Sequence, residues 1–156
     1  MPEIVQIDPV PARYATLTPL EPDYVDVFAV EHGPAGTAED WARAALEGAS
    51  RLGRAFAWQA VLGLRLEPAP SPDRVAGWPI VDRGADHLRL EAKSWSLTAN
   101  VLFVVDDERA SFVTMIRYDR RAGRIVWAPV APVHRRLAMN VMHHALRRMA
   151  RRRAGA

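Results

Sequence analysis

Apolar and polar residues alternate from Val75 to Tyr118, which is the period of β-strands with one buried face. Three turn signals divide this region: a loop around Gly84, a tight turn at 95–96 and a two-residue turn at 107–108. The register that these turns set predicts an antiparallel meander with one apolar face. This face consists of Trp78, Ile80, Leu88, Leu90, Ala92, Ser94, Leu97, Ala99, Val101, Phe103, Val105, Phe112, Thr114, Ile116 and Tyr118.

The opposite face of the predicted meander is polar, and we expect it to be solvated. It carries His87, Arg89, Glu91, Lys93, Thr98, Asn100 and Arg117. The loop around Gly84 predicts that Asp82 pairs with Asp86, and therefore that Ile80 lies opposite Leu88.

A strand and two short helices are predicted before the meander. The strand covers 23–32 and ends at the turn "GPAG". Thr37 is a good N-cap, and Asp40 follows three residues later, so the first helix should begin between them. A second helix is predicted over 51–66, and its middle, 55–64, is apolar on almost every side.

A long C-terminal helix should cover the apolar face of the sheet. Pro132 suits its first turn. Its apolar side consists of Leu137, Ala138, Val141, Met142, Ala145 and Met149. His134 falls on the same side, near the positive end of the predicted helix, where the neutral imidazole is favoured. These elements predict an α+β, helix-grip fold: a curved antiparallel sheet of about five strands around its last helix.

The chain of 156 residues is predicted to form one domain over 1–156. Residues 1–22 are punctuated by prolines and should be extended, and the basic tail 151–156 should fray. The chain has no cysteine, which excludes disulfides, thiol catalysis and thiolate metal sites. It has no apolar run of ~18 residues and no signal-peptide pattern at its start. We therefore expect a cytoplasmic protein.

Charge is distributed unevenly along the chain. Residues 120–156 carry a net charge of +10, whereas 1–119 carry −7. This asymmetry predicts either an anionic partner or a basic segment that lies against the protein's own acidic body. Base-stacking aromatics are absent after Trp127, and the apolar side of the helix is committed to the sheet. We therefore expect a solvated tail, no specific nucleic-acid binding and no membrane insertion.

The histidines of the predicted helix do not indicate a metal site. His143 and His144 project about 100° apart on a helix. The segment also has no carboxylate that could complete a ligand set. No metal and no cofactor is predicted.

The motif "RYDR" at 117–120, then Trp127 and "PVHRRL" at 132–137, resembles the end of START-like proteins (the SRPBCC, polyketide-cyclase-like superfamily). The pattern "GLRL…VAGWPIVDRG…LEAKSW…TAN…RYDR" is similar to one of its bacterial families of unknown function. The resemblance covers about 23–153. It implies a helix-grip domain that binds lipids, polyketides, hormones or aromatic compounds between sheet and helix. It also implies that some relatives are joined to a nucleotide-binding oxidoreductase domain.

The main functional hypothesis is therefore the binding of an apolar or aromatic small molecule between the sheet and the last helix. The predicted ligand-binding residues are Trp78, Leu90, Ser94, Phe103, Thr114, Ile116, Tyr118, His134 and Val141. Tyr118 and His134 should approach each other across this space.

Two other functions remain as alternatives. A cyclase- or isomerase-like enzyme would use His134 with Tyr118, but the predicted sheet offers neither a nucleophile–base pair nor an inward carboxylate. An interaction module would use the apolar second helix to dock on an oxidoreductase partner or on a second copy of the chain.

Overall fold

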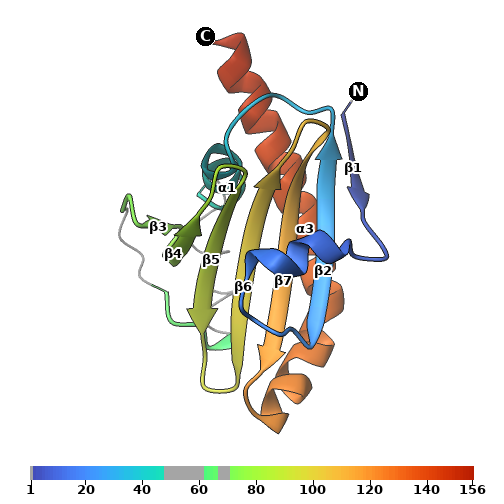
Figure 1. Cartoon of the computed structure of the whole chain (residues 1–156), viewed down its shortest axis with the longest axis vertical. Helices are drawn as coiled ribbons and strands as arrows, with labels where there is room; N and C mark the ends of the chain where they lie inside the picture. The colour runs from blue at the N-terminus through green and yellow to red at the C-terminus, as the bar shows by residue number, and fades with distance from the viewer. Residues whose placement is uncertain (1, 48–61, 67–70) are drawn as a thin grey trace.

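The computed structural model describes residues 2–47, 62–66 and 71–156, and it shows one antiparallel sheet with a long C-terminal helix packed across it (Figure 1). The elements are β1 (Glu3–Gln6), the 3₁₀ helix η1 (Ala12–Leu17), β2 (Tyr24–Glu31), α1 (Ala38–Leu46), β3 (Arg74–Val75), β4 (Trp78–Arg83), β5 (His87–Lys93), β6 (Leu97–Val105), β7 (Arg109–Tyr118) and α3 (Arg121–Ala154). The strand order is β1-β2-β7-β6-β5-β4-β3. The α+β class is confirmed.

The sheet has seven strands, so the prediction of about five was wrong. One additional strand, β1, pairs with β2 at the edge of the sheet and comes from the proline-rich start of the chain. The other, β3, has only two residues and forms a hairpin with β4, in which Ala76 and Gly77 adopt positive φ angles of 53° and 87°. A two-residue strand is too short to show a period in the sequence.

The register of the meander agrees with the prediction in two of its three hairpins. Ser94 donates its backbone N–H to the carbonyl of Leu97 at 2.9 Å, and Leu97 pairs with Tyr118 across β6 and β7. In the first hairpin Asp82 pairs with Arg89 and Ile80 with Leu90, so the predicted pairs of Asp82 with Asp86 and of Ile80 with Leu88 were wrong. A shift of two residues leaves Ile80 on its predicted face.

The start of α1 is the predicted capping box. The Thr37 hydroxyl accepts a hydrogen bond from the Asp40 backbone N–H at 3.1 Å, and the Asp40 carboxylate accepts one from the Thr37 N–H at 2.9 Å. The bond from the Thr37 backbone lowers the pKa of Asp40. The second predicted helix, 51–66, lies mostly outside the described residues. Its predicted use as a docking helix therefore stays a prediction.

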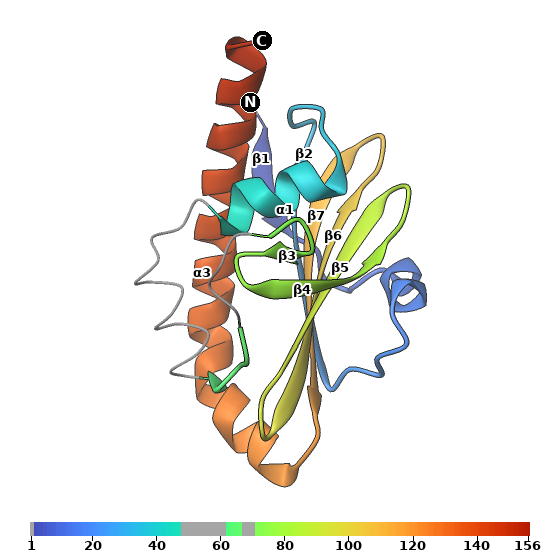
Figure 2. The same cartoon turned by 90° about the vertical axis from the view of Figure 1, so that its left-hand side faces the viewer.

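The outer face of the sheet, opposite α3, is covered at its centre by the N-terminal segment (Figure 2). This segment was expected to be extended, but only part of it is, since Glu3–Gln6 form β1 and Ala12–Leu17 form a 3₁₀ helix. The face was expected to be solvated, which was wrong at its centre, where Thr98 and Asn100 are buried. A second small core lies here and contains Tyr14, Leu20, Val27, Leu102, Val104, Val113 and Met115. Thr18 donates to the buried Asn100, and Arg89 donates to the same amide oxygen, each at 2.9 Å. The Arg89 side chain is therefore only 11% exposed.

Helix α3 begins at Arg121, well before the predicted start at Pro132, and both Pro129 and Pro132 lie inside it. Its buried positions recur at intervals of three and four, as in a helix that packs along one stripe. They are Gly123, Trp127, Ala131, His134, Ala138, Met142, Ala145 and Met149. Leu137, which was predicted to face the sheet, is 39% exposed.

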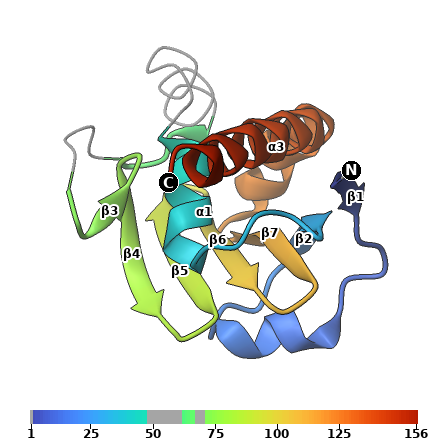
Figure 3. The same cartoon turned by 90° about the horizontal axis from the view of Figure 1, so that it is seen from above.

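The basic end of α3 is helical through Ala154, beyond the point at which the tail was predicted to fray. Seen from above, α1 and this end of α3 lie on the same face of the sheet (Figure 3). Arg148 donates to the carbonyl of Ala44 at 3.3 Å, and Arg152 lies 3.8 Å from the Asp40 carboxylate. Part of the basic segment therefore contacts the acidic body of the protein. No helix in the described part of the chain is long and apolar enough to cross a membrane.

The first turn of α3 is fixed by a close contact between backbones. A Cβ atom at Gly123 would lie 2.5 Å from the carbonyl oxygen of Ser96, so the helix would have to shift away from the sheet. We expect Gly123→Ala to lower the free energy of unfolding by about 1–3 kcal/mol. Gly155→Ala at the other end of α3 is the matched control, because its Cβ would meet only ordinary contacts. Equal denaturant midpoints for the two variants would contradict this account.

Candidate functional site

A group of buried and half-buried polar side chains lies between the sheet and α3. We call it the Asp26 cluster, and it consists of Tyr24, Asp26, Thr114, His134 and Arg135. The side chains of Asp26 and His134 are only 3% and 2% exposed. Carboxylates are almost never buried to this degree unless they are paired, so this cluster is the most unusual feature of the interior.

Strand pairing and helix packing together build the cluster. Asp26 on β2 is the cross-strand partner of Thr114 on β7, and the next inward pair is Phe28 with Phe112. Inward residues alternate along a strand, so the core position of Phe28 also turns Asp26 inward. His134 reaches the same place from the buried stripe of α3.

The imidazole of His134 lies between an alcohol and a carboxylate. Its Nε2 is 3.1 Å from Thr114 Oγ1 and 3.4 Å from Asp26 Oδ2. The Tyr24 hydroxyl donates to the same carboxylate oxygen at 2.6 Å, and Arg135 donates to the Tyr24 oxygen at 3.2 Å. Burial, followed by the bond to Asp26, raises the pKa of Tyr24, so the phenol is held as a protonated donor.

Two buried polar atoms, one in the cluster and one on Trp127, have no hydrogen-bond partner in the described part of the chain. Among the described residues, Asp26 Oδ1 and Trp127 Nε1 are two of the five buried side-chain N and O atoms left without one. The Trp127 ring lies 5.2 Å from each of the rings of Tyr24 and His134, measured between centroids. A buried polar atom without a partner costs free energy, so a group that bonded to it would stabilise the protein.

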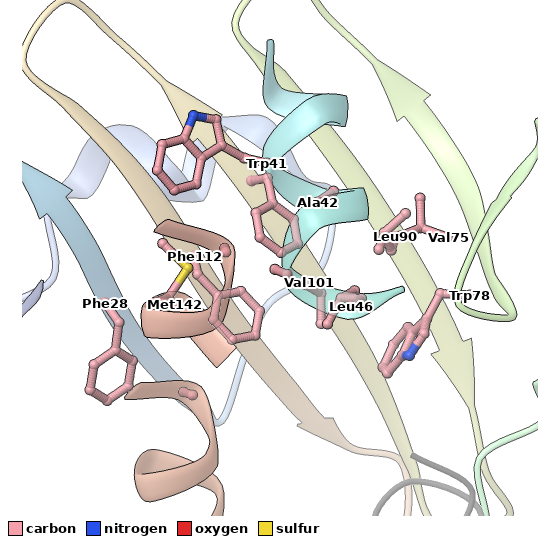
Figure 4. Packing of buried hydrophobic residues seen from close by; sticks show 14 of the residues in the cluster. Phe28, Trp41, Ala42, Leu46, Val75, Trp78, Leu90, Val101, Phe112 and Met142 are labelled. Carbon is pink, nitrogen blue, oxygen red and sulfur yellow. The ribbon is translucent and has the colours of Figure 1, made fainter. Parts of the chain in front are cut away.

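The apolar surroundings of the cluster are aromatic and aliphatic. Phe103 and Phe112 stack with ring centroids 5.1 Å apart, and the Phe112 ring lies 6.5 Å from that of His134. Figure 4 shows Phe112, Phe28 and Met142 together on this side of the core, with Trp78, Leu90 and Val75 on the far side of Leu46. All of these residues belong to one core cluster.

The structure divides the predicted ligand-binding residues among different places. Thr114 and His134 are hydrogen-bonded, Ile116 and Phe103 belong to the same core, and Val141 is half-buried against it. The Ser94 hydroxyl instead accepts the backbone N–H groups of Ser96 and Leu97, each at 3.2 Å, so it serves the β5–β6 turn. Trp78 and Leu90 lie in the region near α1.

The expected approach of Tyr118 to His134 is not found. His134 contacts Thr114, and Tyr118 is four residues farther along β7, a distance of about 13 Å in a strand. Instead, the Arg124 guanidinium lies over the Tyr118 ring, with its Cζ atom 5.8 Å from the ring centroid. His134 also lies well inside α3, which begins at Arg121, and not in its first turn, as was predicted.

The inward carboxylate that the sequence analysis found missing is Asp26. The prediction overlooked it because the register was built only from the meander, and β2 was not included. The signal is present in "DYVDVFAVEH": once Phe28 and Val30 are placed in the core, alternation puts Asp26 and Tyr24 beside them.

No three His, Asp or Glu side chains in the described ranges are grouped so that they could hold a metal ion. Comparisons of the chain with protein-family profiles, curated proteins and solved structures gave no match.

Proposed function

We propose that the protein binds a small, mainly apolar or aromatic molecule between the sheet and α3, and that the Asp26 cluster holds the polar group of that molecule. The observation that carries the proposal is the Asp26 carboxylate, buried in an apolar core with one oxygen unpartnered among the described residues. A site of apolar walls with a few convergent polar groups is the usual form of a small-molecule site.

The unpartnered atoms define the kind of polar group. Asp26 Oδ1 can accept a hydrogen bond, and Trp127 Nε1–H can donate one. A hydroxyl or an amide offers both a donor and an acceptor, whereas a carboxylate would be repelled by Asp26. The proposed ligand is therefore an uncharged aromatic or alicyclic alcohol, phenol or amide. The START-like superfamily, which the sequence resembles, places its ligands in the same layer, and the order of sheet and helix here supports a helix-grip assignment.

The proposal is tested with 2-naphthol, an aromatic probe with a single hydroxyl, and with 2-methylnaphthalene, in which a methyl group replaces it. We expect 2-naphthol to bind the native protein more tightly, by about 0.5–1.5 kcal/mol, because only the hydroxyl can bond to Asp26 and Trp127. Probe fluorescence measures both affinities. Equal affinities, or no binding of either probe, would contradict the proposal.

Two buried threonines on opposite faces of the sheet provide matched variants. Thr114→Val removes the hydroxyl that fixes the His134 ring, and we expect it to weaken 2-naphthol binding. Thr98→Val removes a hydroxyl that is equally buried but bonds to Asp119 on the outer face, so affinity should be unchanged. Near-ultraviolet circular dichroism would establish that both variants keep native packing. Equal losses in the two variants would count against the site.

A second candidate function is proton-transfer catalysis on the same ligand. The observation in its favour is the buried Asp26–His134 pair, since a carboxylate beside an imidazole is a common general acid–base arrangement. Asp26 takes the place that Tyr118 had in the sequence-based hypothesis. In an enzyme of this kind, His134→Ala would abolish turnover, and binding affinity would change little.

A further inference from the structure

A cleft of about 580 Å³ opens where β7 ends and α3 begins. It is lined by Asp23, Tyr118, Arg120, Arg121, Arg124 and Ile125. Its wall comes from the end of β7, the residue before β2 and the first turn of α3, and none of its lining residues belongs to the Asp26 cluster.

Positive charge in this cleft is poorly balanced. In the described part of the chain, no ion pair is formed by Arg120, Arg121 or Arg124. The Asp23 carboxylate also lines the cleft, but it accepts the backbone N–H of Tyr118 at 2.7 Å. The nearby Asp119 carboxylate is bonded to Arg117 at 2.7 Å and to Thr98 at 2.6 Å, and it does not line the cleft.

The location of these arginines is electrostatically unfavourable. The first turn of a helix carries partial positive charge and favours acidic side chains, as in α1, whose first turn holds Glu39 and Asp40. The first turn of α3 has no acidic residue and begins beside three arginines. Three like charges at the positive end of a helix of 34 residues destabilise the protein without an anion.

The cleft is also held in a defined shape. The contact of Gly123 with the Ser96 carbonyl fixes the first turn of α3 against the β5–β6 turn. The Arg124 guanidinium lies over the Tyr118 ring, which restricts its orientation. Guanidinium forks match the tetrahedral oxygens of a phosphoryl group better than ammonium groups do.

We infer that this cleft binds a phosphate-type oxyanion, held by Arg120, Arg121 and Arg124. Three guanidinium groups opposed by one carboxylate suit a dianion, and the helix end adds to the attraction. The phosphoryl group could be free inorganic phosphate or the headgroup of a lipid, and the two sources share this chemistry.

The test compares the wild type with the triple variant Arg120→Gln/Arg121→Gln/Arg124→Gln at low ionic strength, where screening is weak. Calorimetric titration with inorganic phosphate should give an affinity that the triple variant lowers by roughly tenfold or more. Phosphate should also raise the Tm of the wild type and not that of the variant. Without phosphate the variant should have the higher Tm, because the repulsion has been removed.

The control is Arg136→Gln/Arg147→Gln/Arg151→Gln, which removes the same charge from exposed positions elsewhere on α3. It should keep the phosphate affinity, and an equal loss would show general attraction to a basic protein and overturn the inference. In a second arm, vesicles of phosphatidylcholine with phosphatidic acid replace free phosphate. Binding of these vesicles that needs the three cleft arginines, without binding of phosphate, would identify a lipid headgroup. Binding of neither would overturn the inference.

Discussion

Replacing His134 with leucine should lower the free energy of unfolding by about 3–5 kcal/mol, because it leaves the buried Asp26 carboxylate with little compensation. Of the two contacts that the Asp26 carboxylate makes within the cluster, only the hydrogen bond from the Tyr24 hydroxyl would remain. Adding Asp26→Leu should recover most of the loss, since an apolar pair of similar volume fits an apolar core as well as a buried polar pair does. Urea denaturation of the wild type, both single variants and the double variant measures this cycle.

The cycle separates a cluster kept for binding from one kept for stability. If the losses in the two single variants simply add, Asp26 and His134 contribute independently to the fold, and the view of them as one coupled pair is wrong. Recovery in the double variant would mean that the fold does not need the pair. The double variant would then be a folded protein that lacks the polar part of the proposed site.

Trp127→Ala should lower the free energy of unfolding by about 3–5 kcal/mol, the usual cost of removing a large aromatic side chain from a core. Trp127 is 1% exposed and packs against the rings of Tyr24 and His134. Thermal or urea unfolding followed by circular dichroism measures the loss.

Ile125→Ala is the control for this prediction. It lies two residues earlier on the same helix and is 75% exposed, so the change should be within about 0.5 kcal/mol. A similar effect of the two variants would contradict the finding that this early part of α3 packs on the sheet.

The meander was predictable because turns and alternation agree locally. The turns at 95–96 and 107–108 were sufficient to set the pairing of β5, β6 and β7. The pairing of β4 with β5 was predicted wrongly, because the turn lies later than Gly84 suggested, with the Gly84 N–H bonded to the His87 carbonyl. A β-bulge between Ile80 and Asp82 then changes the register again. The N-terminal segment was misjudged for a related reason, since prolines suggest an extended chain but say nothing of what it covers.

The start of α3 and the buried carboxylate depended on contacts distant in sequence. Pro132 is favourable in a first helical turn, so the helix was predicted to start there. The helix starts at Arg121 instead, and the close approach of Gly123 to Ser96 that fixes this start leaves no signal in the sequence. Asp26 became recognisable as inward-facing only when β2 was paired with β7. The sequence pattern of β7 identified Thr114 as inward-facing, and that of the last helix identified His134. It did not identify Asp26, which pairs with Thr114 across the strands and lies beside His134.

The central claim, that the Asp26 cluster holds a small molecule, is tested most directly by native mass spectrometry of freshly purified protein. The wild type should carry an additional small mass that is released on denaturation, and Asp26→Leu/His134→Leu, purified in parallel, should not carry it. An unliganded wild type, or the same added mass on both proteins, would contradict the claim.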